Sequence, residues 1–82
     1  MKKFFVIGLG NFGMNVARSL IDNNCEVLGI DMDRNTVDRA KEFLTHAIIG
    51  NPTSKPVLES LGVHEYDGVI LSIGQEMVSS IL

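Results

Sequence analysis

The sequence predicts an α/β fold in which helices cover both faces of a doubly wound parallel β-sheet. Short apolar runs alternate with helix-like segments four times along the 82 residues, a pattern typical of parallel strands joined by crossover helices. The first run, residues 4–8, is apolar up to its closing glycine, as expected of a strand covered on both faces. Right-handed crossovers would place the strands in the spatial order 3-2-1-4.

The first strand–helix unit is predicted over residues 4–24. After the apolar run, the spacing of apolar residues changes to that of one helical face. Asn23 and Asn24 follow this segment, and asparagine tolerates the left-handed conformation that ends many helices. The predicted apolar face comprises Phe12, Val16, Ala17, Leu20 and Ile21.

The second unit and the third strand repeat this pattern. Residues 25–30, CEVLGI, are interpreted as a strand that ends at Asp31, and residues 46–50, HAIIG, as a short third strand. An amphipathic helix is predicted between them, with an apolar face formed by Val37, Ala40, Phe43 and Leu44.

The last predicted unit begins at residues 51–54, which form a turn and supply a helix cap. Pro56 is tolerated in a first helical turn, and Gly62 ends that helix. Residues 68–73 are predicted as the fourth strand and residues 75–82 as the start of another helix. Because that helix would leave apolar surface open, we expect residues 1–82 to be one domain that is incomplete at its C-terminal end.

Composition argues against several classes of function. The net charge is −3 and the seven basic residues are scattered, so no nucleic-acid partner is predicted. No apolar run approaches the roughly 18 residues of a membrane-spanning helix. The single cysteine, Cys25, excludes an internal disulfide bond and agrees with a cytoplasmic location.

Three glycines between the first strand and the first helix form the motif G-x-G-x-x-G. In this Rossmann-like context Gly8 permits a tight turn, Gly10 lets a phosphate approach the backbone, and Gly13 allows close packing of helix on strand. The free N–H groups of the first helical turn would then face the phosphates. The alternative is that the glycines only form a turn.

Asp31 stands at the end of the second strand, 18 residues after Gly13. A carboxylate at this position can accept hydrogen bonds from the two ribose hydroxyls of an adenosine. It would repel a 2′-phosphate, so NADP is disfavoured. Arg34 is expected to be solvated on the second helix, and the alternative for Asp31 is a strand-end cap.

Two further loops are expected at the same edge of the sheet, where ligands of doubly wound folds bind. The loop after the third strand contains Asn51, Pro52 and Thr53 and would lie near an adenine ring. The loop after the fourth strand contains Ser72, Ile73 and Gly74 and would flank the phosphates. For Asn51 and Thr53 the alternative is a turn and cap role only.

The sequence shows no catalytic constellation. His46 opens a strand and His64 lies far along the chain from the glycine motif, so both are expected to be structural or solvated. No nucleophile–base pair is visible, and Cys25 lacks companions for a zinc site.

The chain resembles a family of regulatory domains of potassium transport, the N-terminal nucleotide-binding RCK or KTN domain of the TrkA and KtrA type. The segments that carry the resemblance cover nearly the whole chain in order, namely FFVIGLGNFG, EVLGIDMD, THAIIGNPT, LESLGV and DGVILSIG. THAIIGNPT is far more specific than the glycine motif and distinguishes this family from general dehydrogenases.

The resemblance implies a cytoplasmic regulatory module rather than an enzyme. Such domains form dimers or octameric rings at the inner face of the membrane, beneath a membrane-embedded potassium channel or transporter. They bind NAD(H) or an adenine nucleotide such as ATP or ADP, and the ligand biases gating of the pore. The positions implied as ligand contacts are Gly8, Gly10, Asn11, Phe12 and Gly13 for the phosphates, Asp31 for the ribose, Asp33, Asn51, Pro52 and Thr53 near the adenosine, and Ser72, Ile73 and Gly74 along the last wall.

Asn11 departs from the family pattern. In the KtrA-like branch this position is commonly arginine, which reaches a terminal phosphate, whereas asparagine carries no charge. Selection of ATP over ADP is therefore not implied for this chain. The rival interpretation of the whole chain is the N-terminal half of an NAD-dependent oxidoreductase, whose catalytic residues would have to follow residue 82.

Overall fold

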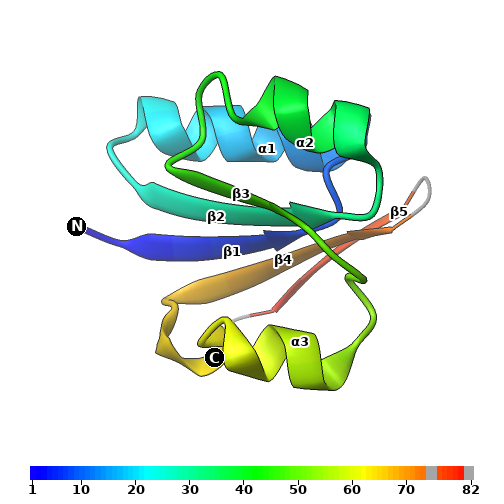
Figure 1. Cartoon of the computed structure of the whole chain (residues 1–82). Helices are drawn as coiled ribbons and strands as arrows, with labels where there is room; N and C mark the ends of the chain where they lie inside the picture. The colour runs from blue at the N-terminus through cyan, green and yellow to red at the C-terminus, as the bar shows by residue number, and fades with distance from the viewer. Residues whose placement is uncertain (74–75, 81–82) are drawn as a thin grey trace.

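The computed structural model describes residues 1–73 and 76–80, with residues 73 and 76–80 described by their backbone alone. Strands and helices alternate along the chain up to the fourth strand (Figure 1). The elements in order are β1 (Lys3–Ile7), α1 (Asn11–Asp22), β2 (Glu26–Asp31), α2 (Arg34–Ala40), β3 (His46–Ile49), α3 (Lys55–Ser60), the 3₁₀ helix η1 (Val63–Glu65), β4 (Gly68–Ile73) and β5 (Glu76–Ser80).

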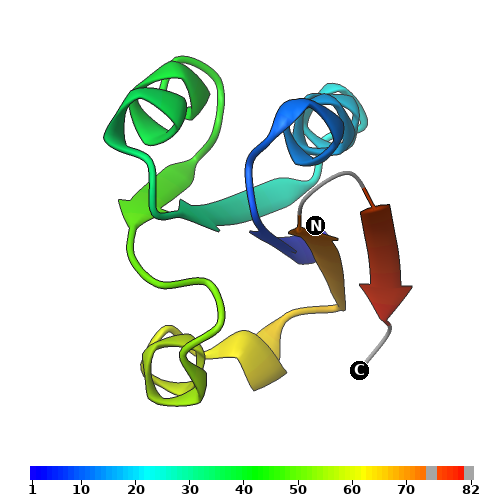
Figure 2. The same ribbon diagram turned by 90° about the vertical axis from the view of Figure 1, so that its right-hand side faces the viewer.

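The sheet lies between two helical layers. Helices α1 and α2 cover one face and α3 covers the other, as both ribbon views show (Figures 1 and 2). The strand order is β3-β2-β1-β4-β5, and β1 pairs in parallel with both β2 and β4 while β2 pairs in parallel with β3. The predicted order 3-2-1-4 of a doubly wound, Rossmann-like sheet is thus confirmed.

The helix predicted over residues 75–82 is wrong for the described residues 76–80. These residues form β5, which pairs antiparallel with β4 so that Glu76 lies opposite Ile73. Short apolar runs do not distinguish helix from strand by periodicity alone. The edge of β4 offers unpaired backbone N–H and C=O groups, which β5 pairs. The remaining positions of this prediction, 74–75 and 81–82, lie outside the described residues.

The core is divided by the sheet into two clusters. The cluster under α1 and α2 contains the buried residues Val6, Leu9, Ala17, Val27, Ala40 and Leu44. The cluster under α3 contains Phe5, Ile7, Leu28, Ile30 and Val69. Successive residues of β1 and β2 therefore alternate between two buried faces, which explains why these strands are apolar at consecutive positions.

The helix ends follow local sequence signals, with one difference. Asn24 has φ 62° just after α1, and Gly62 has φ 76° just after α3, as their residue types predict. Helix α2 ends earlier than predicted, at Ala40, so Phe43 and Leu44 lie in the turn that follows. Leu44 nevertheless enters the core, because its N–H still donates to the carbonyl of Ala40 at 2.8 Å. None of the helices within residues 1–73 and 76–80 is both long and apolar enough to cross a membrane.

Candidate functional site

The parallel strands bring the predicted site residues to one edge of the sheet. The glycine turn follows β1, Asp31 is the last residue of β2, and Asn51 follows shortly after β3. Ser72 lies near the end of β4, the other neighbour of β1. Since these strands run in the same direction, their carboxyl ends meet at the same edge, where ligands of such sheets bind.

The three glycines meet different constraints. Gly8 has φ 93°, a conformation that side chains disfavour, and its N–H donates to the carbonyl of Ile30 at 2.9 Å. At Gly13 a Cβ would lie 2.1 Å from the carbonyl oxygen of Gly8, so helix and turn pack at the distance only glycine allows. At Gly10 a Cβ would meet no atom of residues 1–73 and 76–80 within 4 Å, and the backbone angles, φ −65° and ψ −174°, suit any residue. The described residues therefore do not themselves require glycine at position 10.

The first turn of α1 presents backbone N–H groups at this edge. Gly10 is the N-cap residue and supplies no capping side chain, and no acidic residue stands in the first turn. The carbonyl of Gly10 accepts from the N–H of Met14 at 2.8 Å. Within the described chain no acceptor faces the N–H groups of Asn11, Phe12 and Gly13. These amides form the positive end of the helix dipole, which favours an anion.

The carboxylate of Asp31 is turned toward the glycine turn. Its Oδ2 accepts from the N–H of Leu9 at 2.8 Å, and its Oδ1 accepts from the N–H of Asp33 at 2.8 Å. The residue is half-buried. A carboxylate oxygen can accept two hydrogen bonds, so each oxygen keeps capacity for one more donor, such as a ribose hydroxyl.

Asp33 has a structural role that the sequence did not assign to it. It is the N-cap of α2, and its Oδ2 accepts from the N–H of Thr36 at 3.1 Å and from the hydroxyl of Thr36 at 2.6 Å. The hydrogen bond from the Thr36 side chain is the main cause that lowers the pKa of Asp33 below its usual value, and the backbone hydrogen bond from Thr36 adds to it. Arg34, the next residue, is exposed on α2, as expected.

The loop after β3 is held by its own side chains. Asn51 Oδ1 accepts from the N–H of Thr53 at 2.9 Å and from its hydroxyl at 2.7 Å, so both residues have the turn role considered as the alternative. Asn51 and Thr53 remain exposed, and Pro52 is half-buried. The N–H of Gly50 donates to the main-chain carbonyl of Asp31 at 3.0 Å, which links this loop to the end of β2.

The end of β4 packs against the first turn of α1. Ser72 is buried, and its Cβ lies 3.2 Å from the position a Cβ of Gly13 would take. The side chain of Ile73 and all of Gly74, the other two predicted members of this wall, lie outside the described part of the structure.

Three large apolar side chains are exposed close to these loops along the chain. Phe12 is 49% exposed, although its spacing predicted a place on the buried helical face. Met32 is 66% exposed in the β2–α2 loop, and Ile49 is 48% exposed at the end of β3. Sequence reasoning missed Met32 and Ile49. The sequence IDMD held a signal for Met32, which stands between two acidic residues. An apolar side chain in such a turn has little to pack against and is therefore expected to be exposed.

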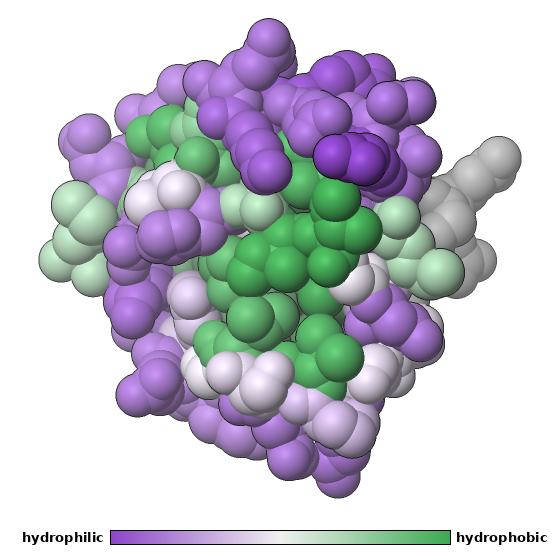
Figure 3. Space-filling view, in the orientation of Figure 1, coloured by the Kyte–Doolittle hydropathy of each residue, from purple (hydrophilic) through white to green (hydrophobic). Residues whose placement is uncertain are grey.

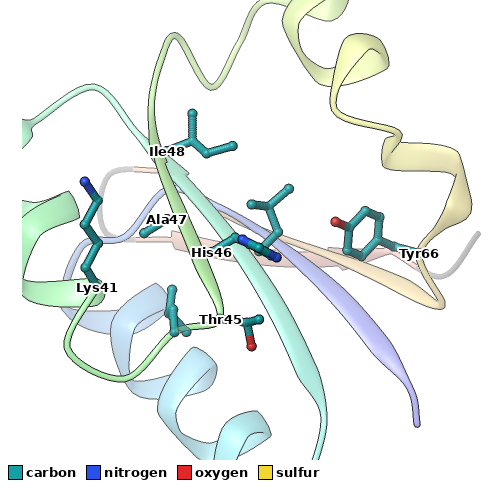
Figure 4. Close-up of a pocket in the computed structure, with 8 residues that line it drawn as sticks. Lys41, Thr45, His46, Ala47, Ile48 and Tyr66 are labelled. Atoms are coloured by element: carbon teal, nitrogen blue, oxygen red, sulfur yellow. The ribbon is translucent and has the colours of Figure 1, made fainter.

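A cavity of about 500 Å³ lies elsewhere, at the outer edge strand β3 (Figure 4). His46 and Tyr66 point toward one another there, while Lys41 points away from both (Figure 4). The surface around β3 carries a broad hydrophobic patch (Figure 3). Residues that line the cavity are Leu28, Lys41, Leu44, Thr45, His46, Ala47, Ile48 and Tyr66. None of the predicted nucleotide contacts is among them.

Ion pairs and clusters of metal-binding groups are sparse in the described residues. The one ion pair within them joins Lys3 to Glu26 at 4.0 Å, at the opposite ends of β1 and β2 from the glycine turn. No group of three or more potential metal ligands occurs in residues 1–73 and 76–80. The polar features beside the glycine turn include main-chain amides and the carboxylate of Asp31, while Asn51 and Thr53 supply polar side chains in the β3–α3 loop.

Comparison with known proteins gives consistent matches. The family model described as the TrkA-N domain matches residues 4–82. The Ktr system potassium uptake protein C of Bacillus subtilis (strain 168) is 40% identical over 81 residues, and the Ktr system potassium uptake protein A of Vibrio alginolyticus is 38% identical over 81 residues. The Trk system potassium uptake protein TrkA of Mycobacterium tuberculosis (strain H37Rv) is 29% identical over 80 residues.

These alignments cover 98–99% of the chain but only 36–37% of each relative. The chain thus spans little more than a third of the length of the relatives it matches. The family match, in contrast, extends over nearly all of its residues, including the glycine turn, Asp31 and the β3–α3 loop. The chain belongs to the TrkA-N domain family.

Proposed function

We propose that this chain is a nucleotide-binding regulatory domain of a potassium uptake system. The glycine turn would hold the phosphates of NAD(H) or of an adenine nucleotide, and Asp31 would hold the ribose. Two kinds of finding support this: the geometry of the turn, and the printed names of the relatives, which are potassium uptake proteins rather than enzymes. The oxidoreductase alternative gains no support from these relatives.

The observation that carries the proposal is the open space at Gly10. A Cβ there would meet no atom of the described residues within 4 Å, and the backbone angles suit any residue. The reason for glycine is then something that approaches from outside the protein. The N–H groups of the following helical turn lie beside it without protein acceptors in the described chain, which is the arrangement that binds phosphates.

The choice among nucleotides follows from the charges near the site. Asp31 would repel a 2′-phosphate, which argues against NADP. Asn11, at the start of α1, carries no charge to place on a terminal phosphate. The candidates are therefore NAD(H) and ATP or ADP, with no built-in preference for a third phosphate.

The regulatory mechanism would be a shift in population between assembly states. A nucleotide changes gating only in so far as it binds one state more tightly than another. The partner would be a membrane-embedded potassium channel or transporter subunit, and the domain would act at the cytoplasmic face as a homo-oligomer, either a dimer or an octameric ring. The names of the relatives support the potassium transport part of this proposal.

The test is a thermal-shift screen of NAD, NADH, ATP, ADP and AMP on the purified protein, alongside the variant Gly10→Val. A ligand at ten times its Kd stabilises the folded state by about 1.4 kcal/mol. In a domain of this size that raises Tm by roughly 5–10 °C. In Gly10→Val the shift should disappear while Tm without ligand changes little, because the new Cβ meets no atom of the described residues within 4 Å.

The control is Asn15→Val, a substitution at an exposed position of the same helix, where the nucleotide-dependent shift should persist. Two results would contradict the proposal: no shift with any of the five ligands, or a Gly10→Val variant that binds as the parent protein does.

A further inference from the structure

Asp31 joins all three loops on the β2 side of the candidate site. Its Oδ2 accepts from the N–H of Leu9 in the glycine turn, and its Oδ1 accepts from the N–H of Asp33 in the β2–α2 loop, each at 2.8 Å. Its main-chain carbonyl accepts from the N–H of Gly50, the first residue of the β3–α3 loop, at 3.0 Å. Loops that are far apart in the sequence are thus tied to one residue.

The glycine turn depends on these bonds for its conformation. Gly8 and Leu9 donate in succession to Ile30 and Asp31, so the first half of the turn is held by the last two residues of β2. Glycines lose much conformational entropy on folding, and a turn rich in them is ordered only by contacts that select one arrangement. The contact to Asp31 is a hydrogen bond to a charged group, the stronger kind.

The side chain of Leu9 adds a second anchor at the same point. It is fully buried in the cluster beneath α1 and α2 and approaches β2 so closely that a Cβ at Gly29 would lie 2.8 Å from it. The amide of Leu9 is directed to Asp31, whereas the amides of Asn11, Phe12 and Gly13 have no acceptor in the described chain. The amide of Leu9 thus serves to order the turn through Asp31, and the amides of Asn11, Phe12 and Gly13 remain available to a ligand.

We infer that Asp31 is a positioning residue for the phosphate-binding turn, in addition to the ribose contact of the proposed function on which this inference rests. The two roles are compatible, since each carboxylate oxygen accepts a second hydrogen bond. The ribose and phosphate halves of the site are therefore coupled through one carboxylate. Phosphate binding depends on Asp31 even when the ligand has no ribose.

The probe that separates the two roles is inorganic pyrophosphate, which has no ribose. A carboxylate that only contacts ribose would leave pyrophosphate affinity unchanged on removal, or increase it, because a negative charge near the anion is lost. If the carboxylate instead positions the turn, its removal should weaken pyrophosphate binding. Asp31→Ala should weaken pyrophosphate binding about tenfold or more, the size expected for loss of a hydrogen bond to a charged group.

Asp31→Asn is the conservative variant. It keeps one oxygen that can accept from Leu9, but its NH2 group cannot accept from Asp33 and the charge is lost. Its affinity for pyrophosphate should therefore lie between those of Asp31→Ala and the parent protein. Asp38→Ala is the control, because it removes the same charge from an exposed position of α2. It should leave pyrophosphate and ADP affinities unchanged in calorimetry.

Amide hydrogen exchange of the ligand-free protein tests the positioning role without any nucleotide. In Asp31→Ala the N–H of Leu9 should exchange about tenfold faster or more. The N–H of Leu28, within β2, reports the global fold and should be unchanged. In Asp31→Asn the N–H of Leu9 should exchange at a rate between those of the parent protein and Asp31→Ala, which would support the role further.

Unchanged exchange at Leu9 in Asp31→Ala would overturn the inference, as would pyrophosphate binding in that variant as tight as in the parent protein. If the parent protein bound neither pyrophosphate nor ADP, the proposed function would fail, and the exchange of Leu9 would still decide whether Asp31 orders the turn. If Asp31→Ala did not fold, Asp31→Asn would decide through the same measurement. Faster exchange of Leu9 than in the parent protein would support the role, because a neutral acceptor holds the amide less strongly, and unchanged exchange would overturn it.

Discussion

Gly10 and Gly13 stand three residues apart in one turn, yet the structure constrains them in opposite ways. A Cβ at Gly13 would collide with the carbonyl of Gly8, whereas a Cβ at Gly10 would meet no atom within 4 Å in the part of the chain that the structure describes. The motif G-x-G-x-x-G predicted this division, with Gly10 for phosphate approach and Gly13 for close packing of helix on strand. At the scale of single residues, one glycine serves the fold and the other is free to serve a ligand.

Stability measurements on two alanine variants check this division. Gly13→Ala forces α1 away from the glycine turn, and overpacking of this kind typically costs about 1–3 kcal/mol of unfolding free energy. Gly10→Ala changes only a helix N-cap and should cost less than about 1 kcal/mol. Urea unfolding of both variants gives the comparison. Equal losses in the two would show that the packing constraint at Gly13 is not real.

The role of Asp33 as the N-cap of α2 can be measured by titration. Its folded-state pKa is lowered by the hydrogen bonds from Thr36. The stability from this cap is therefore fully present above the unfolded pKa, near 3.8, and is lost as pH falls through the lower folded value. Thr36→Val removes the hydroxyl donor, so the pKa of Asp33 should rise toward its usual value in an NMR titration. A pKa that stayed where it was would assign the shift to another cause.

At the scale of elements, β1 organises the molecule. It is the central strand, paired with β2 on one side and β4 on the other, and its residues enter both core clusters. Phe5 is fully buried and meets the ring of Tyr66 edge-on, with centroids 5.3 Å apart and planes at 85°. The glycine turn follows this strand directly, so the candidate site is anchored to the central strand of the sheet.

Truncation of Phe5 should therefore be far more damaging than truncation of Phe12, which is half exposed. Phe5→Ala leaves a cavity and loses an aromatic pair, with an expected cost of about 3–5 kcal/mol. Phe12→Ala should change the free energy of unfolding by about 0.5 kcal/mol or less. Thermal or urea unfolding measures both. Comparable losses would contradict the core position of Phe5.

At the scale of the whole molecule, the parallel arrangement gathers residues that are distant in sequence. The glycine turn, Asp31 and Ser72 come from three strands and meet because those strands run in the same direction. Periodicity, glycine spacing and the acid after the second strand were sufficient to predict this arrangement. The same reasoning failed at residues 76–80, where an apolar stripe suggested a helix and the structure has a strand. Pairing with the edge of β4 is a non-local contact that no local pattern reports.

The sequence by itself determined the alternation of elements, the strand order 3-2-1-4 and the candidate site at the ends of β1 and β2, because each depends on local periodicity, turn chemistry and chain handedness. Only the tertiary structure decided that residues 76–80 pair with β4 as a strand, that Asp33 and Asn51 bond within their own loops, and that Asp31 reaches back to Leu9. Those facts depend on which atoms meet in space, and such contacts are made by residues far apart in the chain or by side-chain rotations that the order of residues does not specify.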